Sequence, residues 1–178
     1  MKHLAWAVAL TILVAVVANG TWGEDAAKAP EPPKHEQVEK IKSLAGDWSG
    51  TFGEGKEAGQ ANLSYKVTAG GSAVVETIFT GTDHEMVTVY TVDHGTLVLT
   101  HYCVMGNQPH MKAAEQKDAN TIEFTCDGKP GNLDADNEAH MHTGKITWVD
   151  ADHIQAEWTA LKDGQPTFQA KLDVTRKK

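Results

Sequence analysis

Hydrophobic and polar residues alternate along most of this chain, as they do in β-strands that have one wet face and one buried face. Leu63, Tyr65 and Val67 alternate with polar residues, and the same two-residue period recurs between Phe168 and Val174. Short turns rich in Gly, Asp and Asn separate such runs. The pattern predicts ten candidate strands, over residues 47–53, 61–69, 72–80, 85–93, 96–104, 108–117, 120–127, 141–149, 153–161 and 166–175.

A meander of this length exposes two sheet edges unless it closes on itself. The sequence therefore predicts an all-β fold, a closed antiparallel up-and-down barrel of eight to ten strands. A short N-terminal helix over residues 35–45 precedes it, because apolar residues recur there at every third position, namely Val38, Ile41 and Leu44. The runs at 72–80 and 85–93 are apolar on both faces, so alternation does not assign their inward side chains.

The start of the chain is typical of an exported protein. Lys2 precedes an uncharged apolar run from Leu4 to Val17, which is shorter than the roughly 20 residues of a membrane-spanning helix. We expect a signal peptide over residues 1–23, with an uncleaved N-terminal anchor as the alternative. A flexible linker rich in Ala, Pro, Lys and Glu follows over 24–37, and the barrel domain over 38–178.

The negative net charge of the chain argues against nucleic acid as a partner. The formal net charge is −8, and no large cluster of Lys and Arg offsets it. Nucleic-acid binding needs a basic surface for the phosphates, so we exclude nucleic acid as a partner. We expect a periplasmic or extracellular protein with a small-molecule partner and no stable membrane insertion after cleavage of the signal peptide.

The stretch from Thr96 to Met111 places polar chemistry where a core is expected. Alternation puts Leu97, Leu99, His101 and Cys103 on one face of a strand. The two leucines identify that face as the buried one. An imidazole and a thiol are therefore predicted to follow them into the barrel interior.

A second pair of histidines shares this predicted interior. In the run 141–149, Ile146 and Trp148 have the same parity as His140 and His142. With His101, three imidazoles would then face the lumen, where they could bind Zn²⁺ or Cu²⁺, and one alone could instead bind haem. The alternatives are hydrogen-bonded histidines that only fill a polar lumen, or a bulge at Gly144 that reverses the parity.

The candidate ligand-contacting residues combine these histidines with neighbouring polar, sulfur and aromatic side chains. They are His101, Cys103, Met111, His140, His142, Trp148 and Glu76. Buried donors and acceptors must be paired, so such a lumen favours an amphipathic ligand over a plain hydrocarbon. No nucleophile or acid–base motif is recognisable, which favours a binding protein over an enzyme, and the residues do not identify a cofactor.

The two cysteines, Cys103 and Cys126, give opposing indications. Export favours a disulfide between them. Regular pairing instead places His101 opposite Met111 and Met111 opposite Cys126, so the cysteines lie two strands, or about 10 Å, apart. A disulfide needs Cα atoms within about 7 Å, which only a bulge at Pro109 would provide. We expect a disulfide between Cys103 and Cys126.

The residues Gly46-Asp47-Trp48, which follow the predicted helix, resemble the opening of lipocalins and other calycins. The resemblance implies that Trp48 closes one end of the barrel and that a basic residue after the last strand, here Arg176, packs on it. Nitrobindin-like haem barrels share the ten-strand count and a similar opening, although their full opening motif is absent from this chain.

Four stretches of the chain are similar to uncharacterised exported bacterial β-barrel proteins. They are Leu99-Thr-His-Tyr-Cys, Gly106-Asn-Gln-Pro, His140-Met-His and Asp150-Ala-Asp-His. This resemblance implies no known activity. The leading hypothesis is an exported barrel that holds a small amphipathic molecule, and the alternatives are a metal- or haem-binding barrel or an enzyme of unknown reaction.

Overall fold

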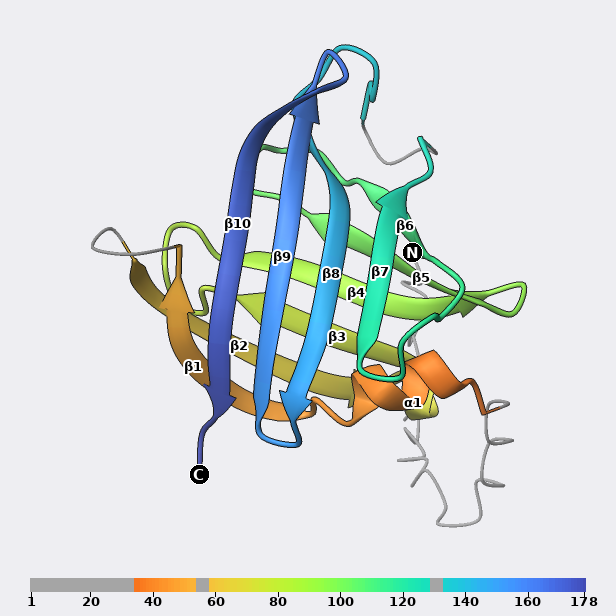
Figure 1. Cartoon of the computed structure of the whole chain (residues 1–178), viewed down its shortest axis with the longest axis vertical. Helices are drawn as coiled ribbons and strands as arrows, with labels where there is room; N and C mark the ends of the chain where they lie inside the picture. Colours follow the sequence, from red (N-terminus) through yellow and green to blue (C-terminus); the bar gives the residue numbers. More distant parts are fainter. Residues whose placement is uncertain (1–33, 54–57, 129–132) are drawn as a thin grey trace, which may run out of the picture. The chain divides into compact units, whose positions relative to one another are not determined.

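The alternating strands pair edge to edge into one closed sheet (Figure 1). The computed structural model describes residues 34–53, 58–128 and 133–178. Within them the strand order around the barrel is β1-β10-β9-β8-β7-β6-β5-β4-β3-β2, and every pairing is antiparallel. The predicted closed, all-β, up-and-down barrel is confirmed. The predicted signal peptide and most of the predicted linker lie outside the described residues.

The elements follow the predicted order, with one helix, one 3₁₀ turn and ten strands in the described part of the chain. They are α1 (Glu36–Lys42), β1 (Gly46–Phe52), β2 (Gly59–Thr68), η2 (Ala69–Gly71), β3 (Ala73–Ile78), β4 (Met86–Asp93), β5 (Thr96–Tyr102), β6 (His110–Ala113), β7 (Thr121–Cys126), β8 (His140–Asp150), β9 (His153–Lys162) and β10 (Gln165–Arg176).

The largest departure from the predicted strands is β6, which is much shorter than the run 108–117. Pro109 has no N–H to donate to a ladder, and its carbonyl accepts the backbone N–H of His101 at 3.0 Å. Leu99, rather than His101, pairs with Met111. The predicted register was therefore wrong by two residues. A register shift by an even number of residues keeps the same side chains pointing inward, so the predicted inward face of β5 is unchanged.

Helix α1 lies at the end of the barrel where β8 turns into β9 (Figure 1). Its buried residues, Val38 and Ile41, belong to the barrel core. On its other side the Lys40 ammonium lies 5.0 Å above the Trp148 ring, and the Gln37 side chain donates to the Ala114 carbonyl. The helix therefore closes this end by burying its apolar stripe.

The same end is fastened by Trp48 and Arg176. Trp48 is fully buried and donates its indole N–H to the Leu44 carbonyl at 2.7 Å. The Arg176 guanidinium lies 4.3 Å above the Trp48 ring and donates to the carbonyls of Ala45 at 2.6 Å and Ser43 at 2.9 Å. The packing implied by the calycin resemblance is confirmed.

Strands β3 and β4, whose inward faces alternation left open, bring polar groups into the barrel. Glu76 is buried between Val74 and Ile78 on β3, and Thr88 pairs with it from β4. Tyr90, two residues farther along β4, is buried as well. The barrel interior therefore contains a carboxyl group that must find hydrogen-bond donors inside the protein.

Replacing Arg176 with Ala should lower the free energy of unfolding by about 2 kcal/mol, because the cation–π contact and the carbonyl hydrogen bonds are lost together. Arg176→Lys should retain part of the stability, since an ammonium keeps the charge but lacks the planar fork. Urea unfolding measures both, with the exposed Lys178→Ala as the control. Equal stability of Arg176→Ala and the control would contradict this role.

Candidate functional site

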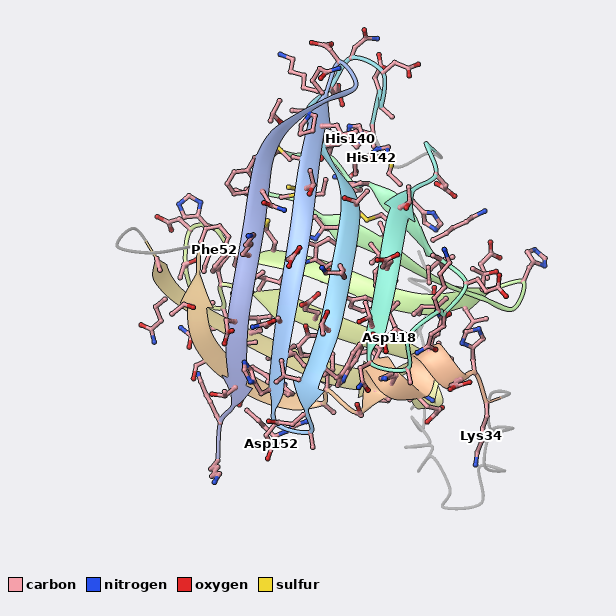
Figure 2. The ribbon with its side chains drawn as sticks, in the orientation of Figure 1. Lys34, Phe52, Asp118, His140, His142 and Asp152 are labelled. Carbon is pink, nitrogen blue, oxygen red and sulfur yellow. The ribbon has the colours of Figure 1, made fainter. Side chains whose placement is uncertain are left out.

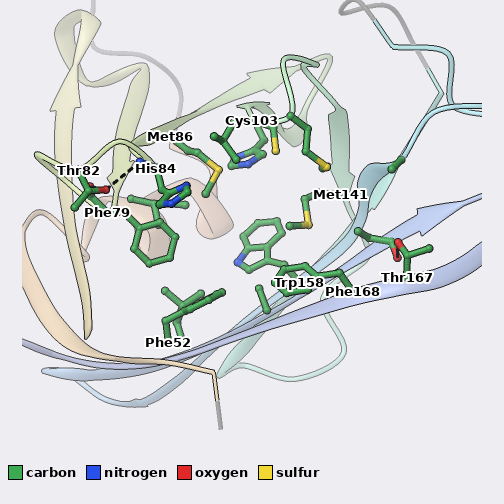
Figure 3. Close-up of a pocket in the computed structure, with 18 of the residues that line it drawn as sticks. Phe52, Phe79, Thr82, His84, Met86, Cys103, Met141, Trp158, Thr167 and Phe168 are labelled. Atoms are coloured by element: carbon green, nitrogen blue, oxygen red, sulfur yellow. Dashed lines mark hydrogen bonds between the residues drawn. The ribbon is translucent and has the colours of Figure 1, made fainter. Parts of the chain in front are cut away.

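The barrel holds a cavity of about 550 Å³ at the end away from α1. Its wall contains several aromatic and sulfur-containing side chains (Figure 3). The aromatic members are Phe52, Phe79, Trp158 and Phe168, and the sulfur-containing ones are Met86, Cys103, Met105 and Met141. A cavity of this size fits one small organic ligand.

The inward face of β5 leads from the core into this cavity. Leu97 and Leu99 are fully buried, and the next inward residue, His101, belongs to the cavity wall together with Cys103. Tyr102 has the opposite parity and is half exposed, as the alternation of β5 predicts. The predicted placement of His101 and Cys103 is therefore observed.

His101 is the most deeply buried polar side chain in the wall, with 5% of its surface exposed. Its Nδ1 lies 2.9 Å from the Thr88 hydroxyl, and its ring stacks on Trp158 at 6.4 Å with an 18° interplanar angle. Its Nε2 is shielded from solvent and has no hydrogen-bond partner among the described residues. Burial lowers the pKa of His101 to about 4, so the ring is neutral at physiological pH.

Behind His101, a hydrogen-bonded cluster surrounds Glu76. The hydroxyls of Tyr65 and Tyr90 donate to its two oxygens at 2.5 and 2.7 Å, and Thr88 hydrogen-bonds it as well. Burial raises the pKa of Glu76, and the three hydrogen bonds oppose that rise. Burial, followed by the charge of Glu76, raises the pKa of both tyrosines, which therefore remain hydroxyl donors.

This cluster decides which nitrogen of His101 carries the proton. While Glu76 is ionised, Thr88 donates its only proton to the carboxylate and can only accept from His101 Nδ1. A neutral imidazole has a single N–H, which is then at Nδ1. With Glu76 ionised, the unpartnered Nε2 therefore offers a lone pair, either to a hydrogen-bond donor or to a metal.

The other predicted histidines belong to a different group. Neither His140 nor His142 lines the cavity, although Ala139 and Met141 do. His140 Nε2 lies 3.1 Å from His142 Nδ1, so both rings are on the same side of β8, as a His-x-His spacing predicts (Figure 2). Cys126 from β7 joins them, and ligand atoms of the three residues lie within 4.8 Å of one another.

The predicted grouping of His101, His140 and His142 around one lumenal site stays a prediction, since His101 lines the cavity while His140 and His142 group with Cys126. The register between β8 and β9 shifts between Met141 and Thr143, which marks a β-bulge at His142. The bulge, two residues before the position at which we considered one, turns Met141 into the cavity. His140 and His142 lie instead beside Cys126, which belongs to the barrel core.

Burial shifts the pKa values of His142 and Cys126 in the direction that favours their neutral forms. Burial, then the neighbouring His140, lowers the pKa of His142, and burial raises the pKa of the Cys126 thiol. His140 donates from Nδ1 to the Glu138 carbonyl at 2.9 Å, since a carbonyl oxygen can only accept. That bond leaves His140 Nε2 as the ring's lone-pair nitrogen.

Three further candidates lie in the barrel core rather than in the cavity wall. Met111 is fully buried opposite Leu99, Trp148 packs beneath Lys40 at the closed end, and Glu76 reaches the cavity only through Thr88. They support the site without lining it.

The predicted disulfide is absent, since both cysteines are free. Cys103 follows the end of β5 at the cavity, whereas Cys126 pairs with Met111 at the end of β7. Strand β6 separates them, and Pro109 shortens that strand without bringing its neighbours together. The expectation based on export was therefore wrong, and the one based on strand spacing held.

The sequence reasoning missed Trp158, the central aromatic residue of the cavity. Alternation could have found it, because Ile154, Ala156 and Ala160 share its parity and are all buried. Its ring occupies the space over Gly144, where a Cβ would overlap it. Phe79 and Phe168 carry no such signal, since one lies in a turn with φ of +56° and the other follows a register shift.

No protein-family model matches this chain, and no curated protein does. None of the helices in the described part of the chain has the length and apolar character needed to span a membrane. The geometry of the barrel interior is therefore the basis for a functional assignment.

The buried His101 should make stability depend on pH. Between pH 6.5 and 4 the unfolded chain protonates this imidazole while the folded chain does not, so the folded state loses stability as pH falls through this window. The advantage of the wild type over His101→Phe should shrink by about 3 kcal/mol between pH 7.5 and 4. Urea unfolding at each pH measures it, with the exposed His94→Gln as control, and parallel pH profiles for wild type and His101→Phe would contradict the burial.

Proposed function

We propose that this chain is an exported, calycin-like barrel that binds one small, largely apolar ligand carrying a hydrogen-bond donor. The observation that carries the proposal is the unpartnered Nε2 of His101 in the wall of an apolar cavity. An unpaired buried nitrogen costs about 1–3 kcal/mol, which a donor on the ligand would recover. Binding would therefore be strongest for a molecule with one polar end.

The shape of the ligand follows from the rest of the wall. Four aromatic rings and four sulfur-containing side chains favour a flat, polarisable body over a flexible chain, because rings stack and sulfur contacts aromatic edges. Exposed polar residues, including Thr82 and His84, lie at the margin of the cavity. A ligand would thus enter past polar groups and bury its ring system against Trp158.

The calycin part of the proposal is supported by the closed end of the barrel. Trp48 lies near the start of the first strand and Arg176 ends the last, and the two stack there. Within the described residues, the short helix α1 precedes the barrel, as the resemblance implies.

Two matched probes test the proposed ligand chemistry. 2-Naphthol can donate its hydroxyl proton to His101 Nε2, whereas 2-methoxynaphthalene cannot. We expect wild-type protein to bind 2-naphthol about tenfold more tightly, as measured by isothermal titration calorimetry. In His101→Phe the preference should disappear because the acceptor is gone.

Thr82→Ala is the matched control, since it changes the cavity margin without touching His101, and it should keep the preference. A preference of equal size in wild type and His101→Phe would overturn the assigned role of Nε2. Failure of both probes to bind would overturn the proposed cavity ligand class.

A second candidate function is haem binding, and the hydrogen bond on His101 Nδ1 favours it. A haem-ligating histidine needs a lone pair on one nitrogen and a hydrogen-bond partner on the other, and His101 meets both requirements. The haem would supply iron as a site for a further small ligand. Hemin titration of the same proteins separates the two functions, since a Soret shift that His101→Phe abolishes would favour haem.

Export rests on the apolar run at residues 4–17 and the small residues after it. We expect the mature protein from its native host to begin between residues 19 and 24. Intact-mass measurement checks this, and a mass that still includes Met1 would favour an N-terminal anchor instead.

A further inference from the structure

Cys126, His140 and His142 form a compact group of nitrogen and sulfur donors outside the cavity wall. Cys126 is the last residue of β7, and the two histidines lie at the start of the neighbouring strand, β8. His140 and Cys126 are buried, and His142 is half-buried. Two strands of the same sheet therefore hold all three side chains.

The available distances are close to those of a metal site. Zinc bonds of about 2.0–2.1 Å to nitrogen and 2.3 Å to sulfur, arranged tetrahedrally, give donor–donor distances of about 3.3 and 3.6 Å. The two histidine nitrogens are already 3.1 Å apart, and all three donors lie within 4.8 Å of one another. Small side-chain rotations would bring them to the required spacing.

The hydrogen bonds of His140 supply an independent observation. Its Nδ1 donates to the Glu138 carbonyl, so the Nε2 lone pair is the one directed at His142. Histidine ligands in metal sites commonly donate their other ring proton to a carbonyl in this way, which fixes the tautomer and the ring orientation. In the metal-free protein, His142 Nδ1 donates its proton in a hydrogen bond to His140 Nε2.

We propose that Cys126, His140 and His142 bind a divalent transition metal through Sγ, Nε2 and Nδ1. One thiolate and two imidazoles suit Zn²⁺ or Cu²⁺ and exclude Ca²⁺ and Mg²⁺, which prefer oxygen. Zn²⁺ serves as the probe. His142 is half-buried, so a water molecule can complete the fourth position.

Neighbouring charged groups do not compete for this role. The carboxylate of Asp127 lies 3.3 Å from His110 and 3.7 Å from the Lys112 ammonium. It therefore already lies close to two basic side chains on β6. The proposed ligand set thus consists of the three residues alone, and it is separate from the ligand-binding proposal for His101.

The test uses the full chain without a polyhistidine tag, stripped with a chelator and kept reduced. Competition with a chromophoric chelator should give one Zn²⁺ per chain with a dissociation constant below about 1 μM. Cys126→Ser and His140→Gln should each weaken binding at least about 100-fold, because each removes a ligand. Cys103→Ser should bind as the wild type does, since Cys103 lies at the cavity.

Cobalt provides a second readout that a loss of stability would not imitate. Co²⁺ bound to wild type and Cys103→Ser should give a thiolate-to-cobalt charge-transfer band, which Cys126→Ser should lack. Thermal unfolding of the metal-free variants reports whether they fold.

Absence of stoichiometric Zn²⁺ binding, or binding retained in both folded ligand variants, would overturn the site. The preference for 2-naphthol in Cys126→Ser should be unchanged, so failure of this site and failure of the cavity proposal are distinguishable. If Cys126→Ser and His140→Gln do not fold, the cobalt spectrum of the wild type alone tests the site. A spectrum without the thiolate band would exclude Cys126 as a ligand.

Discussion

The pairing of the first strand with the last is the constraint on which the rest of this protein depends. β1 meets β10 over Trp48↔Arg176 to Phe52↔Leu172, and at Gly50 the backbones are so close that a Cβ would overlap Asp173. Closure gives every strand two neighbours and separates the inward side chains from water. Without it, the burial that holds His101 neutral would not exist.

Closure of the barrel also removes the carboxyl group of Glu76 from solvent, and this burial is the main unfavourable contribution inside the barrel. Burying Glu76 is costly, and hydroxyl donors from Tyr65, Tyr90 and Thr88 offset that cost. The arrangement has a consequence at the cavity. If Glu76 is protonated, Thr88 can turn its proton towards His101 Nδ1, and Nε2 then carries the ring's N–H. The charge of a carboxyl group behind the wall thus decides whether His101 accepts or donates.

Much of the fold and part of the site could be predicted from the sequence, because side-chain alternation is reliable wherever a strand is regular. On β5 it placed His101 inward and Tyr102 outward, even though the predicted register was wrong by two residues. The same rule failed on β8, because one extra residue at His142 reverses the parity and no composition signal marks it. The cavity itself depends on turn residues such as Phe79, whose positions follow from tertiary packing.

That single extra residue lies where an apolar cavity and a group of nitrogen and sulfur donors meet at one end of β8. In a regular strand His140 and His142 would both face inward with Gly144, and Met141 would face outward. The bulge at His142 reverses this for the first residues only, so Met141 lines the apolar cavity while the two imidazoles turn towards Cys126. The cavity thus keeps His101 as its one deeply buried polar contact, and the nitrogen and sulfur donors of His140, His142 and Cys126 gather outside the cavity wall. One local irregularity of the backbone therefore lies between the cavity proposed for the organic ligand and the three residues proposed to bind a metal.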